Sequence, residues 1–264
     1  MKNVKFSLKT YLFIVIALSW PFQIAFIFLG DEYRKLLLVS MLMVAVATFI
    51  CGKYIFKNGF SEVGWKWGKL KYYGYALGLA AFLWLVPSLL ERYLGWYVAI
   101  EDVSVVEYLK IFATSFLITL IPAFSEEFAW RGYLLPNLRD SYSDKKALWI
   151  HAVITWVWHL PVVIMMGVGM GGNIAISIAL VLVVSLIPTV MHAIVFAYLW
   201  SRSGSIAVAT VYHSAFDEIR DSLEESVGLG ALGQNWQMLV LTILGIYFMK
   251  KGKWGVNKNI KNRV

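Results

Sequence analysis

Three short segments of the sequence place ionisable side chains inside apolar stretches. These side chains are Glu126, Glu127, Arg131, His159, His213 and Asp217. An ionisable group at membrane depth costs about 2.5 to 3.5 kcal/mol on insertion scales, so each one needs a partner, a cavity or a function. Carboxylate and imidazole groups together can activate water and stabilise an oxyanion, with or without a metal ion. The residue types therefore point to hydrolysis.

The first segment contains two adjacent carboxylates with unequal surroundings. On a helix, Glu127 and Arg131 are four residues apart and can pair on one face, whereas Glu126 points about 100° away. One carboxylate is thereby neutralised, and the other is left over as a candidate general base. The alternative is that both are solvated helix-end charges among lipid headgroups, although Phe124 and Phe128 keep the neighbourhood apolar.

The histidines of the other two segments lie well inside their predicted helices. His159 is about 12 residues, or ~18 Å, from the start of its span at Ala147. His213 and Asp217 are spaced i and i+4, so one helix face presents both, and a carboxylate commonly orients a histidine in this way. The alternatives are a hydrogen-bonded packing role for His159 and an interhelical hydrogen bond for His213. If these groups converge, they line a polar intramembrane cavity that opens to the cytoplasmic side.

Two other histidines, His151 and His192, complete no metal-ligand spacing such as HExxH, and we expect packing or interfacial roles for them. Four prolines within or at the ends of spans are expected to kink helices. They are Pro87, Pro122, Pro161 and Pro188.

The elements that must position these residues are transmembrane helices. Of 264 residues, 59% are hydrophobic and 15% are charged, which excludes an ordinary soluble domain. The net charge of +8 is spread in short clusters, unlike the continuous basic surface of a nucleic-acid-binding protein, and the single Cys51 excludes an internal disulfide. We predict an all-α transmembrane bundle of about eight spans. The spans are Tyr11–Leu29, Leu36–Phe56, Tyr72–Leu90, Tyr108–Phe124, Ala147–Val168, Ile174–Trp200, Ile206–Phe216 and Ala231–Met249.

The distribution of basic residues predicts the orientation of these spans. If all eight cross, alternate connections lie on one side, and 19 of the 24 Lys and Arg residues gather there together with both termini. Because the positively charged side is cytoplasmic, both termini are expected in the cytoplasm. We expect an integral protein of a bacterial plasma membrane, with one domain over residues 1–250, a core over about 105–220 that contains the three segments, and a basic cytoplasmic tail over 251–264.

The three segments resemble the motifs of a known family. The sequence EEFAWR at 126–131 resembles the EExxxR motif of the CPBP intramembrane proteases, which include type II CAAX prenyl endopeptidases and bacteriocin-processing or immunity proteins. The sequence WHLP at 158–161 resembles the FxxxH motif of that family, and HSAFD at 213–217 resembles its HxxxN/D motif. The motifs follow in the family's order and with similar spacing, between about Ile111 and Asp217.

The resemblance implies a role for each residue. Glu126 would activate the attacking water, His159 would hold that water, and His213 with Asp217 would stabilise the tetrahedral oxyanion. Glu127 and Arg131 would be structural partners. These six side chains are therefore the expected site.

The resemblance leaves the cofactor and the substrate open. The family is described as metalloproteases, and a metal-independent glutamate mechanism is also argued for it, so either a divalent metal such as zinc or no cofactor is expected. A bound metal would be held by Glu126, His159 and His213. Thr155 stands four residues before His159, where the family often has Phe, and Asp217 stands where the prenyl enzymes use Asn, which puts a prenylated substrate in question.

The expected activity is endopeptidase cleavage near the cytoplasmic membrane face. The expected partners are a hydrophobic or lipidated peptide or protein substrate and membrane lipid, and no nucleic acid. One alternative is a proton-coupled transporter, because Glu and His chains also relay protons. Another is a non-catalytic relative that confers bacteriocin immunity or acts as a scaffold.

Overall fold

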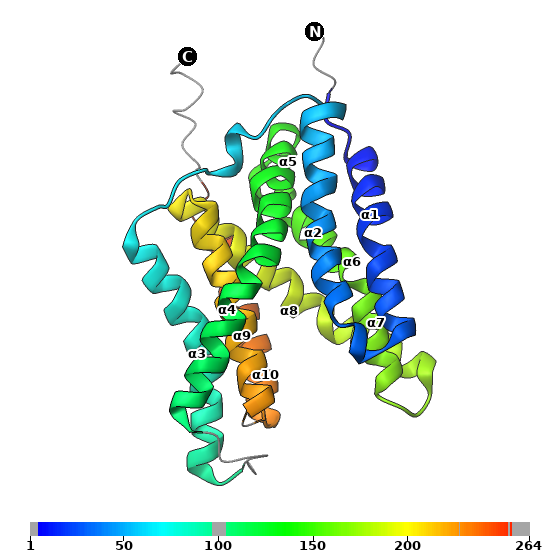
Figure 1. Ribbon diagram of the computed structural model, residues 1–264. Coiled ribbons are helices and arrows are strands. Elements are labelled where there is room, and N and C mark those ends of the chain that lie inside the picture. Colours follow the sequence, from blue (N-terminus) through cyan, green and yellow to red (C-terminus); the bar gives the residue numbers. More distant parts are fainter. Residues whose placement is uncertain (1–4, 97–103, 227, 253, 255–264) are drawn as a thin grey trace.

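The computed structural model describes residues 5–96, 104–226, 228–252 and 254, and within them every regular element is helical. The predicted all-α fold is thus confirmed for this part of the chain (Figure 1). The long helices are α1 (Leu8–Leu29), α2 (Lys35–Ile50), α3 (Leu70–Leu94), α4 (Val105–Glu127), α5 (Leu135–Ser141), α6 (Asp144–Trp158), α7 (Leu160–Gly169), α8 (Ile174–Ser203), α9 (Ile206–Ser226) and α10 (Ala231–Lys251). Short helices are η1 (Asp31–Tyr33), η2 (Cys51–Ile55), η3 (Ser61–Val63) and η4 (Phe128–Leu134). Most of the predicted tail lies outside the described residues.

Among the residues that the structure describes, five helical stretches are long and apolar enough to cross a membrane. They are α1, α2 with η2, α3, α4 through α5, and α8; the pair α6 and α7 makes a sixth if it is counted as one span. These correspond to the first six expected segments. The last two expected segments fall on α9 and α10, which do not meet the same criterion, so the count of eight stays a prediction.

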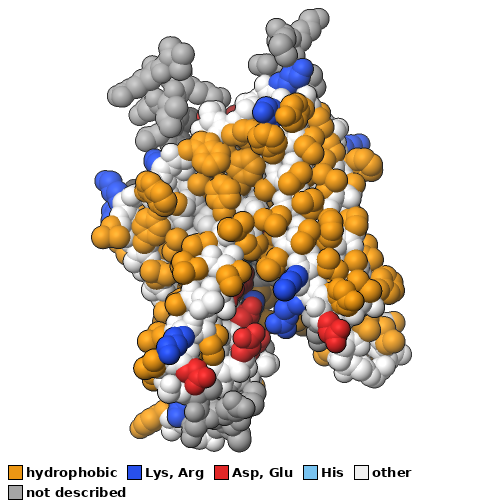
Figure 2. Space-filling view, viewed as in Figure 1, with side chains coloured by type: hydrophobic (Ala, Val, Ile, Leu, Met, Phe, Trp, Pro, Cys, Tyr) orange, Lys and Arg blue, Asp and Glu red, His pale blue; other side chains and the backbone are white. Residues whose placement is uncertain are grey.

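Large apolar side chains cover the outside of the bundle, as a lipid-facing surface requires (Figure 2). Phe13, Leu117 and Val183, from three different helices, are all mostly exposed. An aqueous surface with so many exposed apolar groups would favour aggregation. The exterior therefore fits an integral membrane protein.

The segment predicted as one span over Ala147–Val168 is instead two helices with a bend of 50° between them. Pro161 lies in the first turn of α7, where its missing N–H costs no helical hydrogen bond, and its ring disfavours the helical conformation just before it. His159 lies between α6 and α7. The bend thus places one of the expected site residues at a break in the span.

The helix α9 is longer than the predicted span Ile206–Phe216 and continues to Ser226. It packs against α3, α4 and α8, so it lies inside the bundle rather than at its edge. At its start, the backbone N–H of Ile206 donates to the carbonyl oxygen of Gly64 at 3.1 Å, which ties α9 to the connection between α2 and α3. Two of the three expected motifs therefore meet through the α4–α9 contact.

Candidate active site

Glu127 is the buried centre of the site. An Arg131 guanidinium nitrogen lies 2.8 Å from its Oε1 atom, and the two side chains are almost fully buried. The guanidinium group also lies over the ring of Phe196 on α8, 4.2 Å from the ring centroid. The predicted Glu127–Arg131 pair is thus present, and it is held from a second helix.

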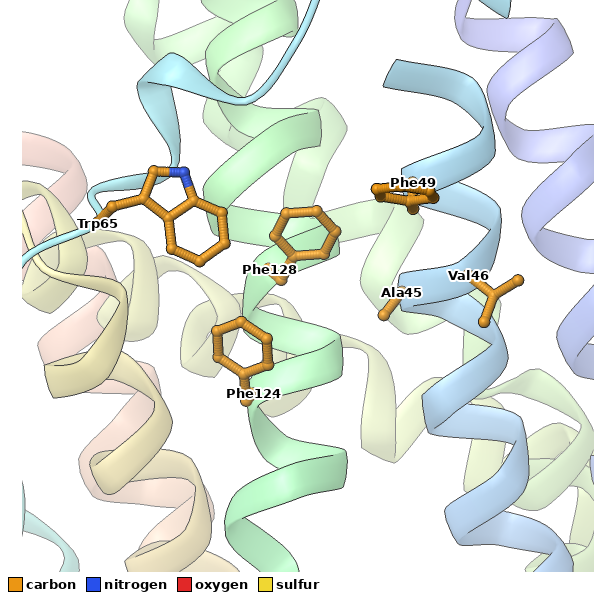
Figure 3. A pocket seen from close by; sticks show the side chains of 6 residues that line it. All are labelled: Ala45, Val46, Phe49, Trp65, Phe124 and Phe128. Carbon is orange, nitrogen blue, oxygen red and sulfur yellow. The ribbon is translucent and has the colours of Figure 1, made fainter. Parts of the chain in front are cut away.

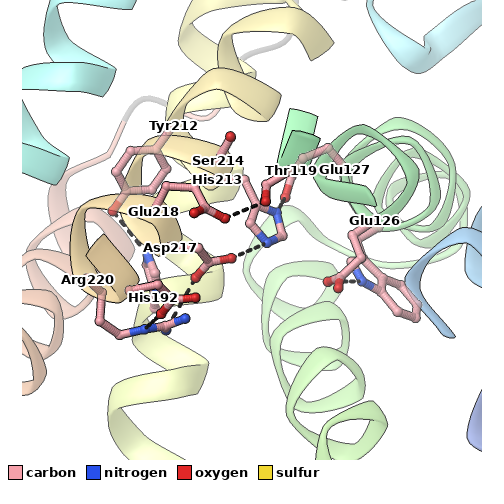
Figure 4. A network of polar contacts seen from close by, with 12 residues as sticks. Thr119, Glu126, Glu127, His192, Tyr212, His213, Ser214, Asp217, Glu218 and Arg220 are labelled. Carbon is pink, nitrogen blue, oxygen red and sulfur yellow. Dashed lines mark hydrogen bonds and ion pairs between the residues drawn. The ribbon is translucent and has the colours of Figure 1, made fainter. Parts of the chain in front are cut away.

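The same carboxylate oxygen reaches across to α9. Nδ1 of His213 lies 2.9 Å from Oε1 of Glu127, and Nε2 of His213 lies 3.3 Å from Oδ2 of Asp217 (Figure 4). The His213–Asp217 contact confirms that both side chains use one face of α9. Because each ring nitrogen faces a carboxylate, both hydrogen bonds form only when both nitrogens donate, which is the imidazolium form.

Asp217 has a further partner that the sequence reasoning missed. An Arg220 guanidinium nitrogen lies 3.3 Å from Oδ1 of Asp217, and Nε of Arg220 donates to Oδ1 of Asp221 at 2.6 Å. The i,i+3 spacing of Asp217 and Arg220 on one helix is the signal that could have identified this pair. Arg220 therefore holds the carboxylate that orients His213.

Glu126 has different surroundings from its neighbour. Its side chain is buried and accepts a hydrogen bond from Nε1 of Trp130 at 3.2 Å, as Figure 4 also shows. It forms no ion pair with Arg131 or His213 among the described contacts. The predicted separation of the two carboxylates on the helix is confirmed, and the i,i+4 spacing of Glu126 and Trp130 is a signal that sequence reasoning passed over.

Two aromatic rings, those of Trp158 and Trp130, connect His159 to Glu126 in a series of contacts. The Nδ1 atom of His159 is 2.7 Å from the carbonyl oxygen of Thr155, so that nitrogen carries the proton and Nε2 is left as an acceptor. The His159 ring packs edge-on against Trp158, and Trp158 packs edge-on against Trp130. Trp130 thus contacts Glu126 on one side and the Trp158–His159 pair on the other.

The remaining two histidines, for which packing or interfacial roles are expected, both lie within the packed bundle. Nε2 of His192 lies 3.0 Å from the Tyr212 hydroxyl, and its ring packs against Phe196 and Phe216. His151 is fully buried in α6. Neither side chain touches the Glu126 or Glu127 carboxylate.

The donor geometry does not fit a resident metal ion. Among the described residues, no three His, Cys, Asp or Glu side chains are placed so that they could hold one. In particular, both nitrogens of His213 already face carboxylate oxygens, and Nδ1 of His159 faces a backbone carbonyl. We therefore derive no chemical step through a metal held by Glu126, His159 and His213.

An apolar groove of about 360 Å³ lies between α2 and α4, next to the turn that carries the two glutamates. Its walls are shown in Figure 3. They are formed by Ala45, Val46, Phe49, Trp65, Phe124 and Phe128. Phe124 and Phe128 bracket Glu126 and Glu127 in the sequence, so the groove and the carboxylates are set by the same two turns of helix. The predicted polar cavity open to the cytoplasm stays a prediction.

The helix is widened at these residues. Residues Phe128–Leu134, which include Trp130 and Arg131, form the π-helical segment η4 between α4 and α5. Such segments are rare and are found most often at functional sites. The extra residue per turn changes which side chains face α9 and α6, and no feature of the sequence predicted it.

Comparison with known families gives a match over the segment that carries these side chains. Residues 108–219 match the family described as Rce1-like, type II CAAX prenyl endopeptidase Rce1-like. The matched segment is somewhat under half of the chain and contains all the side chains of the site. Comparison with curated proteins gives no match.

Proposed function

We propose that this chain is a member of the CPBP intramembrane proteases and that it hydrolyses a peptide bond within the membrane with Glu126 as the base. The proposal is supported by the similarity of residues 108–219 to the type II CAAX prenyl endopeptidases. The observation that carries the assignment of the base is the contrast between the two glutamates. Glu127 is neutralised by Arg131 and His213, whereas Glu126 accepts one hydrogen bond, from the neutral Trp130 indole. Because no direct ion pair occupies its carboxylate oxygens in the described contacts, Glu126 is the glutamate that can accept a proton from water.

The proposed reaction uses side chains of the chain alone. Water lies between Glu126 and the free Nε2 atom of His159; Glu126 takes one proton, and the hydroxide oxygen bonds to the carbonyl carbon of the peptide. The oxyanion that forms is stabilised by the His213 imidazolium, displacing the longer, 3.3 Å contact with Asp217. When the C–N bond breaks, the proton on Glu126 passes to the leaving amine, which restores the carboxylate.

The proposed substrate is a hydrophobic or lipidated peptide. The groove beside the glutamates is lined by apolar side chains, so an apolar side chain or lipid group bound there would lie next to the carboxylates. Asp217 replaces the Asn of the prenyl enzymes, and in this structure it is committed to His213 and Arg220. This supports an orienting role for Asp217 and gives no preference for a prenyl group over another apolar group.

The test is the variant Glu126→Gln in purified protein reconstituted into lipid vesicles. The probes are a farnesylated CAAX-type peptide and the same peptide without the lipid, with products identified by mass spectrometry. Loss of a general base should lower kcat/KM by about 100-fold or more. The matched control is Glu91→Gln, because Glu91 is also buried and Gln can still accept its hydrogen bond from the Leu232 backbone N–H.

Two results would count against the proposal. If Glu126→Gln cleaves as fast as the parent while Glu91→Gln does too, Glu126 is not the base. If the parent protein cleaves neither peptide nor a wider set of hydrophobic peptides, the endopeptidase assignment itself fails.

A further inference from the structure

The helix α9 carries charged side chains on the face that presents His213. They lie between His213 and the C-terminal end of the helix. His213, Asp217, Arg220 and Glu224 follow each other at spacings of four, three and four residues, which keeps them on one face. We call these residues, with Asp221, the polar face of α9. In the other direction the same face continues with Thr210, which is buried. The polar face therefore starts at the site and runs to the C-terminal end of the helix.

Side-chain exposure rises steadily along this face. The exposed fraction is 12% for His213, 23% for Asp217 and 34% for Arg220. Asp221 follows with 37%. A side chain sealed by neighbouring helices would not show this gradient. The gradient indicates an opening that narrows from the end of α9 toward the buried site.

The side chains along the opening are joined by ion pairs. His213 contacts Asp217, Asp217 contacts Arg220, and Arg220 contacts Asp221. At the end of the helix, Glu225 lies 3.8 Å from Arg34, and both are well exposed. Figure 2 shows acidic and basic side chains gathered where the surface is hollowed between the two lower parts of the molecule.

The opening lies at a definite end of the bundle. The 21 residues of α9 span about 30 Å, which is the thickness of the hydrocarbon core. The start of α9 is bonded to Gly64 in the α2–α3 connection, whereas its end pairs with Arg34 in the α1–α2 connection. Because α2 joins these two connections, they lie at opposite ends. The polar face therefore opens at the end of the bundle that carries the α1–α2 connection, opposite the end where α1 begins (Figure 1). With the N-terminus in the cytoplasm, as the basic residues predict, this is the non-cytoplasmic end, whereas the cavity expected from the sequence opens to the cytoplasm.

The chemistry of this face suits water rather than a proton relay. Charged side chains facing lipid cost several kcal/mol each, so a row of them needs water or protein on its open side. An uninterrupted relay needs groups that release and rebind protons, and the Arg220 guanidinium between Asp217 and Asp221 stays protonated. These charged side chains can still bind water, although Arg220 interrupts a proton relay.

We infer that water reaches the buried site along the polar face of α9, from the end of the bundle that carries Arg34. The inference rests on the proposed function, because each peptide bond hydrolysed consumes one water molecule. The apolar groove lies on the other side of α4, between α4 and α2, so peptide and water approach the glutamates from different sides. Water is thus supplied without passing the bound apolar substrate.

The test uses single cysteines in a Cys51→Ala background, which is free of other thiols. Glu224→Cys and Asp221→Cys probe the polar face. Thr210→Cys is the matched control, because it lies on the same face of α9, one turn from His213 in the other direction. Arg34→Cys and Lys69→Cys mark the two ends, since both positions are exposed. A membrane-impermeant maleimide is applied to one side and then the other of sealed vesicles with a single protein orientation.

The inference predicts that Glu224→Cys and Asp221→Cys react from the side at which Arg34→Cys reacts, and that Thr210→Cys reacts from neither side. Unmodified Glu224→Cys should keep the parent's turnover of the cleaved peptide, and its modification should lower turnover by about tenfold or more. Reaction from the Lys69→Cys side, equal reaction of Thr210→Cys, or full turnover after complete modification would overturn the inference. The labelling pattern tests the route of water access even if no peptide is cleaved. A failure of the proposed peptidase function can therefore be distinguished from a failure of the proposed water route.

Discussion

The buried Arg131–Glu127 pair should dominate the stability of the site. Replacement of Arg131 by Met keeps the volume of the side chain and removes its charge, which leaves the Glu127 carboxylate in a fully buried position with His213 as its remaining partner. Breaking a buried pair by removing one partner costs about 3 to 5 kcal/mol. At 1.36 kcal/mol per factor of ten, the unfolding equilibrium constant should rise by about 160-fold to 5,000-fold.

The origin of this loss can be separated from general disturbance by a double-mutant cycle. In Glu127→Gln/Arg131→Met, position 127 carries no buried charge that has lost its Arg131 partner, so the double variant should be more stable than Arg131→Met by about 2 kcal/mol or more. The exposed Arg202 on α8 is the control, because Arg202→Met should change the free energy of unfolding by less than about 0.5 kcal/mol.

The measurement is reversible denaturant unfolding of the purified protein in detergent micelles, followed by tryptophan fluorescence. The reasoning is refuted if Arg131→Met unfolds within about 0.5 kcal/mol of the parent. It is also refuted if the two substitutions are additive. In that case Glu127→Gln would lower the free energy of unfolding by the same amount in the Arg131→Met background as in the parent, and the two side chains would contribute independently.

Two further predictions concern the chemistry. Because no three donor side chains of the described residues are placed to hold a metal, protein stripped by a chelator and shown to be metal-free by mass spectrometry should keep its kcat/KM to within about twofold; loss of activity that zinc restores would contradict this. His159→Ala and His213→Ala should each lower kcat/KM by about 100-fold or more. His192→Ala should lower it by less than about tenfold, because the His192 ring packs against Phe196 on its own helix. Equal losses in all three variants would show that the site residues are wrongly assigned.

The parts of the site that sequence predicts are those set by one helix turn. The Glu127–Arg131 and His213–Asp217 contacts follow from the i,i+4 spacing, and both are present. The contact between Glu127 and His213 joins residues far apart in the chain, and helical spacing carries no information about it. It depends on the packing of α4 against α9, which is decided by all the side chains in that interface.

Local backbone changes were the second class of feature that the sequence did not predict. Pro161 indicated a kink, but a break that separates α6 from α7 at His159 depends on how each half packs against α8. The π-helical segment Phe128–Leu134 has no special residue that demands it; Gly132 lies within it, with the Val63 side chain packed closely against its backbone. Such segments are selected by tertiary contacts, which a sequence pattern does not display.

The case of α9 shows why a hydropathy criterion fails for the helix that matters most to the chemistry. Such a criterion averages over all sides of a helix, and α9 has apolar residues where it packs on α3, α4 and α8, together with the charged residues of its polar face. Its average is therefore low even though it runs the length of a span through the middle of the bundle. A helix of this kind is stable within a membrane only when its charged side faces water or paired groups. The charged residues that lower the mean hydropathy of α9 are the same ones that extend from the surface at Glu225 to the buried His213.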